Sequence, residues 1–100
     1  MLKGDFDMNE IKKDENKFYI GENSQNALAE ITFVPDGDSK IIVNHTYVSE
    51  SLRGQGIALK LVKRVIEYAR KENIKIVPLC SYVEKVMTRN EEYKDVLFEK

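Results

Sequence analysis

Two glycines separated by one residue mark the part of the sequence best suited to bind an anion. They lie in the segment Arg53-Gly54-Gln55-Gly56-Ile57-Ala58. Glycine has no side chain, so the backbone can approach a ligand closely and can adopt left-handed conformations without strain. A helix that begins here directs its unpaired N–H groups and the positive end of its dipole toward the loop. The segment therefore predicts a phosphate or pyrophosphate site.

The residues on either side of this loop predict a strand before it and a helix after it. Lys40–Val48 alternates two sets of side chains, with Ile41, Val43, His45 and Tyr47 on one face and Ile42, Asn44, Thr46 and Val48 on the other. After the loop, apolar residues recur every three or four positions and predict one helix that ends near Asn73. Lys75–Leu79 predicts a second strand. This order predicts two parallel strands joined by a crossover helix, with a ligand site beyond their carboxyl ends.

The other predicted elements complete one small domain. We expect residues 1–16 to be a flexible segment with a short strand near Ile11, and residues 17–100 to form the folded domain. Two further strands, a turn and two short closing helices are predicted at Lys17–Ile20, Ala27–Val34, Pro35–Asp38 and after Cys80. The fold class is α+β: an antiparallel meander and a parallel crossover in one mixed sheet, with one long helix and short C-terminal helices.

Composition limits the classes of function. The chain has 100 residues, of which 42% are hydrophobic and 33% charged, as is typical of one soluble globular domain. A net charge of -1 gives no field that attracts nucleic acid or an anionic membrane. There is one cysteine, no long apolar run and no signal-peptide pattern. We therefore expect a cytoplasmic protein with neither nucleic acid nor membrane as a partner.

The loop and its flanking elements resemble the pyrophosphate loop of the GNAT acetyltransferases, whose pattern is Arg/Gln-x-x-Gly-x-Gly/Ala. A Walker loop is excluded because no Gly-Lys-Ser/Thr follows, and a dinucleotide fingerprint is excluded because Leu59 stands where its third glycine belongs. The resemblance covers roughly Ile41 to Leu79, and Pro78–Val83 is similar to the very short, single-domain branch of that superfamily. It implies a GNAT-like fold and transfer of an acetyl group from acetyl-CoA, without a metal, to a small amine or a protein or peptide amine.

The resemblance also implies which residues bind coenzyme A. In that fold the sheet opens between the strand before the loop and the next parallel strand, and the pantetheine arm lies in the opening. Main-chain groups of Tyr47, Val48 and Ser49 would then bond the arm. The pyrophosphate would lie against the loop residues Arg53, Gly54, Gln55, Gly56, Ile57 and Ala58. For Lys60, Lys63 and Arg64 a solvated helix face is the simpler interpretation, and binding of the adenosine 3′-phosphate is the alternative.

Two residues are candidates for the chemistry. Cys80 follows the second parallel strand, where its thiolate could accept the acetyl group or its thiol could protonate the departing CoA; packing as a small hydrophobe is the alternative. His45 is the only histidine, and imidazole is the side chain best suited to act as a general base near neutrality; filling a sheet face is the alternative. Tyr82 and Tyr93 are possible proton donors or core residues.

The sequence departs from the larger GNAT enzymes at both ends. It lacks the helix with an Asn-x-x-Ala-x-x-x-Tyr pattern after the last strand and the long N-terminal strand–helix–helix segment, so the acceptor is not specified. The main hypothesis is an acetyl-CoA-dependent N-acetyltransferase that is a monomer or weak dimer. A non-catalytic CoA or acyl-CoA-binding module is the alternative, and a structural domain without a ligand is the third possibility. Product formation from an amine separates the first two, and CoA binding excludes the third.

Overall fold

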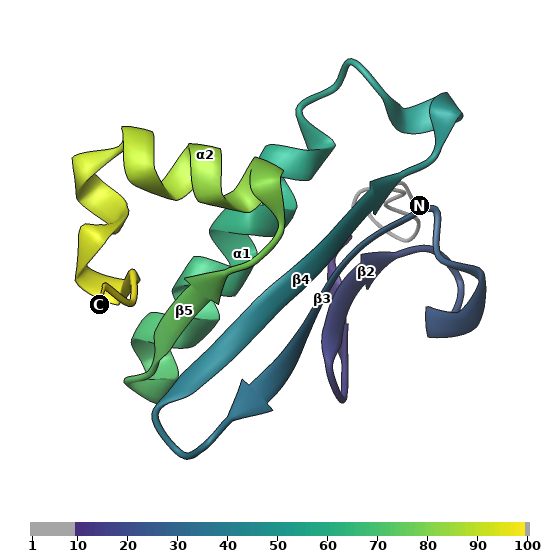
Figure 1. Cartoon of the computed structure of the whole chain (residues 1–100). Helices are drawn as coiled ribbons and strands as arrows, with labels where there is room; N and C mark the ends of the chain where they lie inside the picture. The colour runs from purple at the N-terminus through teal and green to yellow at the C-terminus, as the bar shows by residue number, and fades with distance from the viewer. Residues whose placement is uncertain (1–9, 100) are drawn as a thin grey trace.

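The computed structural model describes residues 10–99 and places them in one five-stranded sheet with two α-helices (Figure 1). The strands are β1 Lys12–Asp14, β2 Lys17–Ile20, β3 Ala29–Asp36, β4 Lys40–Val48 and β5 Lys75–Pro78, and the helices are α1 Ile57–Glu72 and α2 Ser81–Arg89. Short 3-10 helices occur at Ser24–Asn26, Glu50–Leu52 and Glu91–Val96.

The strands follow one another across the sheet in chain order. β1 to β4 are antiparallel neighbours, and β5 pairs parallel to β4 after the crossover through α1. Short turns suffice between antiparallel strands, whereas a parallel pair needs a long connection, which α1 supplies. The predicted mixed sheet with one long helix is confirmed. The strand predicted near Ile11 is β1; residues 1–9 of the predicted flexible segment lie outside the described residues.

β3 runs further than the sequence predicted. It was expected to end at Val34, but it continues through Pro35 to Asp36, and the turn to β4 is at residues 37–39. The Phe33 N–H donates to the carbonyl of Asn16 at 2.9 Å, on the β2 side of the strand. The nitrogen of Pro35, two residues later, faces the same side, past the first residue of β2. Its missing N–H therefore costs no ladder hydrogen bond.

α1 covers one face of the sheet, and the hydrophobic core lies between them. Its predicted stripe is buried almost as expected, with Ile57, Leu61, Val62, Val65, Ile66 and Ala69 all at 1% exposure or less. Against it pack the buried side chains of β2 to β5, among them Phe18, Ile31, Val43 and Ile76. α1 ends at Asn73, which has φ 60° and donates its N–H to the carbonyls of Ala69 and Arg70. Asparagine tolerates this left-handed conformation, so the predicted helix end is confirmed.

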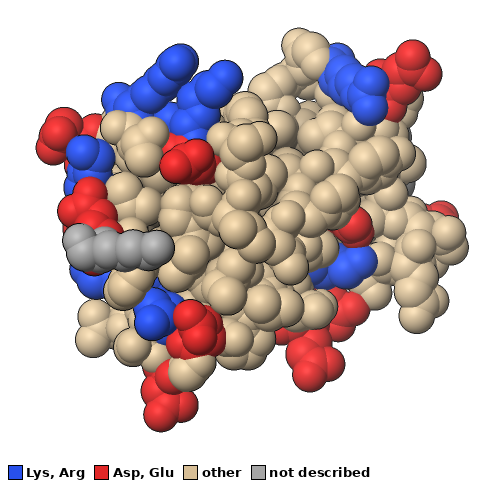
Figure 2. All heavy atoms as spheres, viewed as in Figure 1, with Lys and Arg blue, Asp and Glu red and all other residues tan. Residues whose placement is uncertain are grey.

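The opposite face of the sheet is open. In the view of Figure 1, β4 and β5 lie in front of α1, and Figure 2 shows the same side as spheres. Charged residues of both signs lie mostly toward the edges of this view, and uncharged residues fill its centre (Figure 2). Val34, Ile42 and Val77 are cross-strand neighbours on this face and are only partly covered. Within residues 10–99 the sheet is thus packed on one side only. None of the helices in residues 10–99 has the length and apolar character needed to cross a membrane.

The C-terminal segment, residues 91–98, is bonded to α1 and β5. The Arg70 guanidinium makes two bonds to the Asp95 carboxylate, at 2.8 and 2.9 Å, and a third to the carbonyl of Glu92. Phe98 donates its N–H to the carbonyl of Ile76 at 2.8 Å, and Leu97 forms a parallel bridge with Ile76. The segment therefore covers part of the exposed edge of β5, where an unpaired strand would otherwise invite association.

Replacement of Asp95 by Asn should weaken the ion pair with Arg70 and so lower stability in a pH-dependent manner. The hydrogen bonds from Arg70 hold the pKa of the Asp95 carboxyl below its usual value. A depressed pKa stabilises the folded state above the ordinary aspartate pKa of about 3.9, and this stabilisation is lost as the pH falls through the folded value. Because the pair is half exposed, we expect Asp95→Asn to cost at most about 1 kcal/mol at neutral pH.

Urea unfolding at neutral and at acidic pH measures this difference. Asp36→Asn is a matched control, because its contact with Lys40 is a single exposed one of 3.7 Å and should contribute less. An equal effect of Asp95→Asn at both pH values would show that the loss comes from packing and not from the charge.

Candidate functional site

The sheet opens between β4 and β5 at the point where the loop-bearing strand continues alone. The two strands pair only from Lys40 to Val43 on β4 and from Lys75 to Pro78 on β5. The carbonyl of Val43 accepts the N–H groups of both Leu79 and Cys80, each at 3.0 Å. After this point the chain turns away into α2, while β4 runs on to Val48 (Figure 1). The described structure therefore contains the predicted split between the two parallel strands.

A β-bulge in β4 lies at the start of this split. Thr32 of β3 is opposite His45, but Phe33 is opposite Val43, so Asn44 has no partner in the register. The Thr32 hydroxyl instead bonds the side-chain oxygen of Asn44 at 2.6 Å. One extra residue in a strand reverses the alternation of side chains beyond it.

The bulge changes which side chains of β4 enter the split. Thr46 and Val48 are opposite Ile31 and Ala29, which are fully buried, so they share the core face of the sheet. His45 lies on the opposite, open face, and so does Tyr47. The predicted alternation is correct for Ile41 and Val43 and wrong from His45 onward, because simple alternation cannot include the bulge.

Beyond the bulge, the main-chain N–H and carbonyl groups of β4 point alternately toward β3 and toward the split. The N–H of Ser49 donates to the carbonyl of Leu28 at 2.7 Å, so the main-chain groups of Ser49, and of Tyr47 two residues before, face β3. Those of Thr46 and Val48 consequently face the split. The carbonyl of Val48 accepts a bond from Nε of Arg53 at 3.0 Å, which ties the loop to the strand.

The loop has the backbone that its two glycines predicted. Gly54 has φ 82° and Gly56 has φ 74°, both left-handed, and Gly56 is the N-cap of α1. A Cβ added at either position would meet nothing within 4 Å, so glycine is needed here for the conformation and not for packing. No side chain caps α1, and residues 53–56 are exposed. Buried Leu52 and Ile57 anchor the two ends of the loop, and an open helix N-terminus lies between them.

Cys80 lies in the split, half-buried beside Thr46. Its Sγ is 3.5 Å from Oγ1 of Thr46, and Cys80 is the N-cap of α2. Burial raises the pKa of the thiol, but the nearby N–H group of Val83, the Thr46 hydroxyl and the N–H groups of Tyr82 and Thr46 outweigh it, so the pKa is lowered overall. These polar groups favour the thiolate, which is the nucleophilic form of cysteine.

His45 is not brought to Cys80. It lies on the open face of β4 with a side chain that is 57% exposed, and its Nε2 is 4.0 Å from a carboxylate oxygen of Glu30. Glu30 is also paired with Lys17 at 2.8 Å. Of the two tyrosines considered as proton donors, Tyr82 is in the first turn of α2 beside Cys80, whereas Tyr93 is buried in the core.

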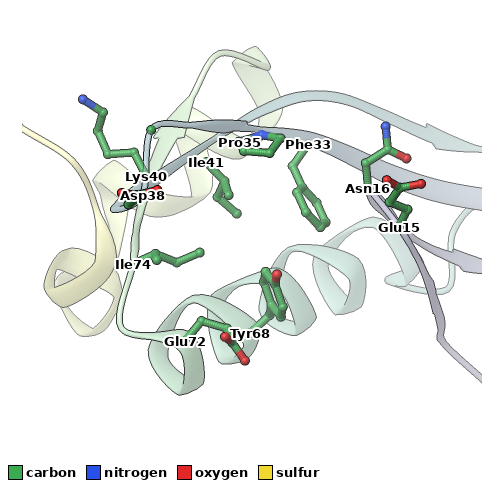
Figure 3. Close-up of a pocket in the computed structure, with 11 residues that line it drawn as sticks. Glu15, Asn16, Phe33, Pro35, Asp38, Lys40, Ile41, Tyr68, Glu72 and Ile74 are labelled. Atoms are coloured by element: carbon green, nitrogen blue, oxygen red, sulfur yellow. The ribbon is translucent and has the colours of Figure 1, made fainter.

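A separate cavity of about 590 Å³ lies near the other end of β4, between the β3–β4 turn and the end of α1 (Figure 3). Phe33 and Tyr68 contribute aromatic surface to it, and Glu15, Asp38 and Glu72 contribute carboxylates. It contains none of the predicted site residues. The split and the loop, which contain most of them, are the better candidate site because they offer open main-chain groups.

Thr46 is the site residue that sequence reasoning missed. Simple alternation assigned it to the face opposite His45 but gave it no role, because nothing in the sequence marks Asn44 as a bulge. The available signal was only a polar side chain among apolar ones close to the loop.

The sequence matches proteins whose general description is known. The sequence model of a family described as GCN5-related N-acetyl-transferase matches residues 17–96. A GCN5-like protein from Staphylococcus aureus, solved in solution, is 43% identical and superposes with a TM-score of 0.79 over 95% of this chain and 93% of that one. Protein NATD1 of Danio rerio is 28% identical over 81% of this chain and 74% of its own length.

A more distant structure supports the likeness of fold alone. A GNAT family acetyltransferase from Elizabethkingia anophelis, solved with acetyl-CoA bound, is 22% identical and has a TM-score of 0.52. The similarity covers 62% of this chain and 40% of that one. The relation to the S. aureus protein, by contrast, extends over nearly the full length of both chains.

Side chains at Gly56 test the backbone argument. Gly56→Ala should destabilise the fold by about 1–2 kcal/mol, because alanine at this left-handed φ is strained although it meets no neighbour. Gly56→Asn should cost less, since asparagine adopts this conformation more readily. Urea unfolding of both variants measures the difference. Equal losses of unfolding free energy in the two variants would mean that the cost comes from side-chain bulk and not from the backbone conformation.

Proposed function

This chain belongs to the GCN5-related N-acetyltransferase family, and we propose that it transfers an acetyl group from acetyl-CoA to an amine. The observation that carries the proposal is the glycine loop at the uncapped N-terminus of α1, placed next to the split between β4 and β5. A loop of this kind binds phosphates, and a split beside it offers main-chain partners to an extended ligand. Arg53 links the two features, because its Nε donates to the Val48 carbonyl at 3.0 Å.

The two ends of acetyl-CoA would meet different parts of this surface. The pyrophosphate lies against residues 53–58, where main-chain N–H groups are the donors because the side chain of Ile57 is buried. Arg53 then exchanges its bond to the Val48 carbonyl for the phosphates, which frees that carbonyl for the pantetheine arm. The Val48 main chain, which faces the split, supports its predicted part in binding. Tyr47 and Ser49 flank it and direct their own main-chain groups to β3.

Cys80 is the proposed nucleophile. Its thiolate attacks the thioester carbonyl carbon, a new S–C bond forms, and the bond between that carbon and the CoA sulfur breaks. The CoA thiolate leaves and takes a proton from solvent. The acceptor amine then attacks the acetyl-cysteine, loses a proton, and returns Cys80 to the thiolate. The lowered thiol pKa and the position of Sγ in the split support this order of events.

His45 has less support as a catalytic base. Its side chain is on the face of β4 opposite Cys80, so a direct proton transfer between the two requires a different path. We propose instead that His45 acts on the open face. There it would receive a proton from the acceptor through water, with Glu30 as its partner. The acceptor is proposed only as an amine, and the protein as a cytoplasmic monomer or weak dimer that uses no metal.

Acetyl-CoA should bind and stabilise the fold. A ligand at a hundred times its dissociation constant adds about 2.7 kcal/mol, which raises the melting temperature of a domain this small by roughly 10 °C or more. Gly54→Asp and Gly56→Asp should abolish the shift, because each places a carboxylate beside the phosphates. Differential scanning fluorimetry with acetyl-CoA measures it.

Gly37→Asp is the matched control for these variants. Gly37 has φ 73° and open space around it, as the loop glycines do, but it lies in the β3–β4 turn, away from the loop. This variant should keep the full shift with acetyl-CoA. No shift for the unmodified protein at millimolar acetyl-CoA would remove the proposed function, and loss of the shift in all three variants would mean that the effect is not local.

Cys80→Ala separates a nucleophile from a packing residue. As a nucleophile, its loss should lower turnover by orders of magnitude while acetyl-CoA still binds, and Cys80→Ser should not rescue it because a hydroxyl ionises far less readily. A packing role predicts only about 1 kcal/mol of lost stability. Mass spectrometry of the unmodified protein after acetyl-CoA should find an acetyl group on Cys80 that an amine removes. Full turnover by Cys80→Ala contradicts the covalent route, and binding without any product favours a non-catalytic binding module.

A further inference from the structure

The sulfur of Cys80 has one side-chain hydrogen-bond partner in the described residues. That partner is Thr46, whose hydroxyl oxygen lies 3.5 Å from Sγ. Cys80 is also the N-cap of α2, but its side chain makes no capping hydrogen bond to that helix. The Cys80 main chain is held as well, since its N–H donates to the Val43 carbonyl at 3.0 Å. The thiol is thus fixed between the end of β5, the start of α2 and the part of β4 beyond the bulge.

We propose that Thr46 is a positioning residue whose hydroxyl donates a hydrogen bond to the Cys80 thiolate and holds the sulfur in the split for attack on the thioester. The inference rests on the proposed function, because it assigns a role within that same site. The thiol proton passes to solvent when the thiolate forms, and the hydroxyl hydrogen bond is retained by the charged sulfur. Hydrogen bonds to a charged acceptor are stronger than those to a neutral one, so Thr46 favours the reactive form.

The bulge at Asn44 explains why this position on β4 can act. Without the extra residue, strict alternation would place Thr46 on the open face and His45 in the split. With it, Thr46 lies on the same face as buried Ile31, directly beside Cys80. Threonine is branched at Cβ and has few rotamers in a strand, so its hydroxyl is held in place better than that of serine.

The hydroxyl can be tested separately because no charged side chain bonds the sulfur in residues 10–99. On β4, His45 and Tyr47 point to the other face. On α2, Tyr82 and Glu84 are the titratable residues of the first turn, and Lys75 is at the far end of β5. A change in thiol ionisation after removal of the hydroxyl therefore reports the lost hydrogen bond.

The experiment measures alkylation of the full-length protein by iodoacetamide across the pH range around the ordinary cysteine pKa of about 8.5. Cys80 is the only cysteine, so the rate reports this thiol alone. Thr46→Val removes the hydroxyl at nearly constant shape and should slow alkylation near neutral pH by about tenfold or more, as the loss of one bond to a charged group predicts. It should also move the midpoint of the pH profile upward. Thr46→Ser should restore most of the rate.

Thr32→Val is the matched control. Its hydroxyl is on the opposite face, bonded to Asn44, and its removal should leave both rate and pH profile unchanged. Alkylation of Thr46→Val at the unmodified rate and with the unmodified profile overturns the inference, and so does an equal slowing by Thr32→Val. If Thr46→Val does not fold, Thr46→Ala replaces it: the inference then requires slowed alkylation in Thr46→Ala together with a nearly unmodified rate in Thr46→Ser.

A failure of the Thr46 hydrogen bond and a failure of the proposed function give different results. The melting shift with acetyl-CoA is measured on the same samples. A slowed alkylation in Thr46→Val without any acetyl-CoA shift in the unmodified protein would support the hydrogen bond to the thiolate but reject the CoA site, and with it a role of Thr46 in acetyl transfer. A clear shift, together with acetylation of Cys80 and unchanged alkylation, would support the acetyl transfer and reject the role of Thr46.

Discussion

The carbonyl of Val43 is the point on which the candidate site depends. It accepts two N–H groups, from Leu79 and Cys80, and these are the last main-chain bonds that join β4 to the chain leaving β5. A parallel ladder that continued would use the main-chain groups of Thr46 and Val48 and close the split. Because it stops here, these groups face a space that a ligand can enter. The same two bonds fix Cys80 at the inner end of that space, so the opening of the sheet and the placement of the thiol have one physical cause.

The sequence predicts the supporting framework well and the detail of the site less well. Periodicity predicts the apolar stripe of α1, and backbone chemistry predicts its end at Asn73 and the left-handed conformation of the two glycines that precede the helix. The structure has all three features. These signals are local, since each depends on residues close together in the chain. The longer course of β3 through Pro35 depends instead on where β2 begins, which is a tertiary fact that residue types near the proline do not report.

The bulge shows most clearly what the sequence could not predict. Lys40–Val48 contains polar and apolar residues that alternate well in either of two registers, so the pattern does not say where an extra residue is inserted. The buried partners on β3, Ala29, Ile31 and Phe33, select the register, because all three must face α1. That choice exchanges His45 for Thr46 next to Cys80. A prediction based on alternation therefore identified the strand correctly but assigned His45 and Tyr47 to the wrong face of it.

Because the chain is small, the hydrogen bonds that hold its C-terminal segment matter for the site. α1 carries the loop at its N-terminus, while the residues at its other end bond the C-terminal segment through Arg70 and Asp95. That segment lies along β5, whose last residues lead directly to Cys80. The loop and the thiol are thus connected through bonded elements: α1 bonds the C-terminal segment, and this segment bonds β5. Both the loop and the thiol also contact β4. The described part of the chain packs this five-stranded sheet on one side and places no second layer against β5. The bonds of the C-terminal segment substitute for the helix or strand that a larger domain would use.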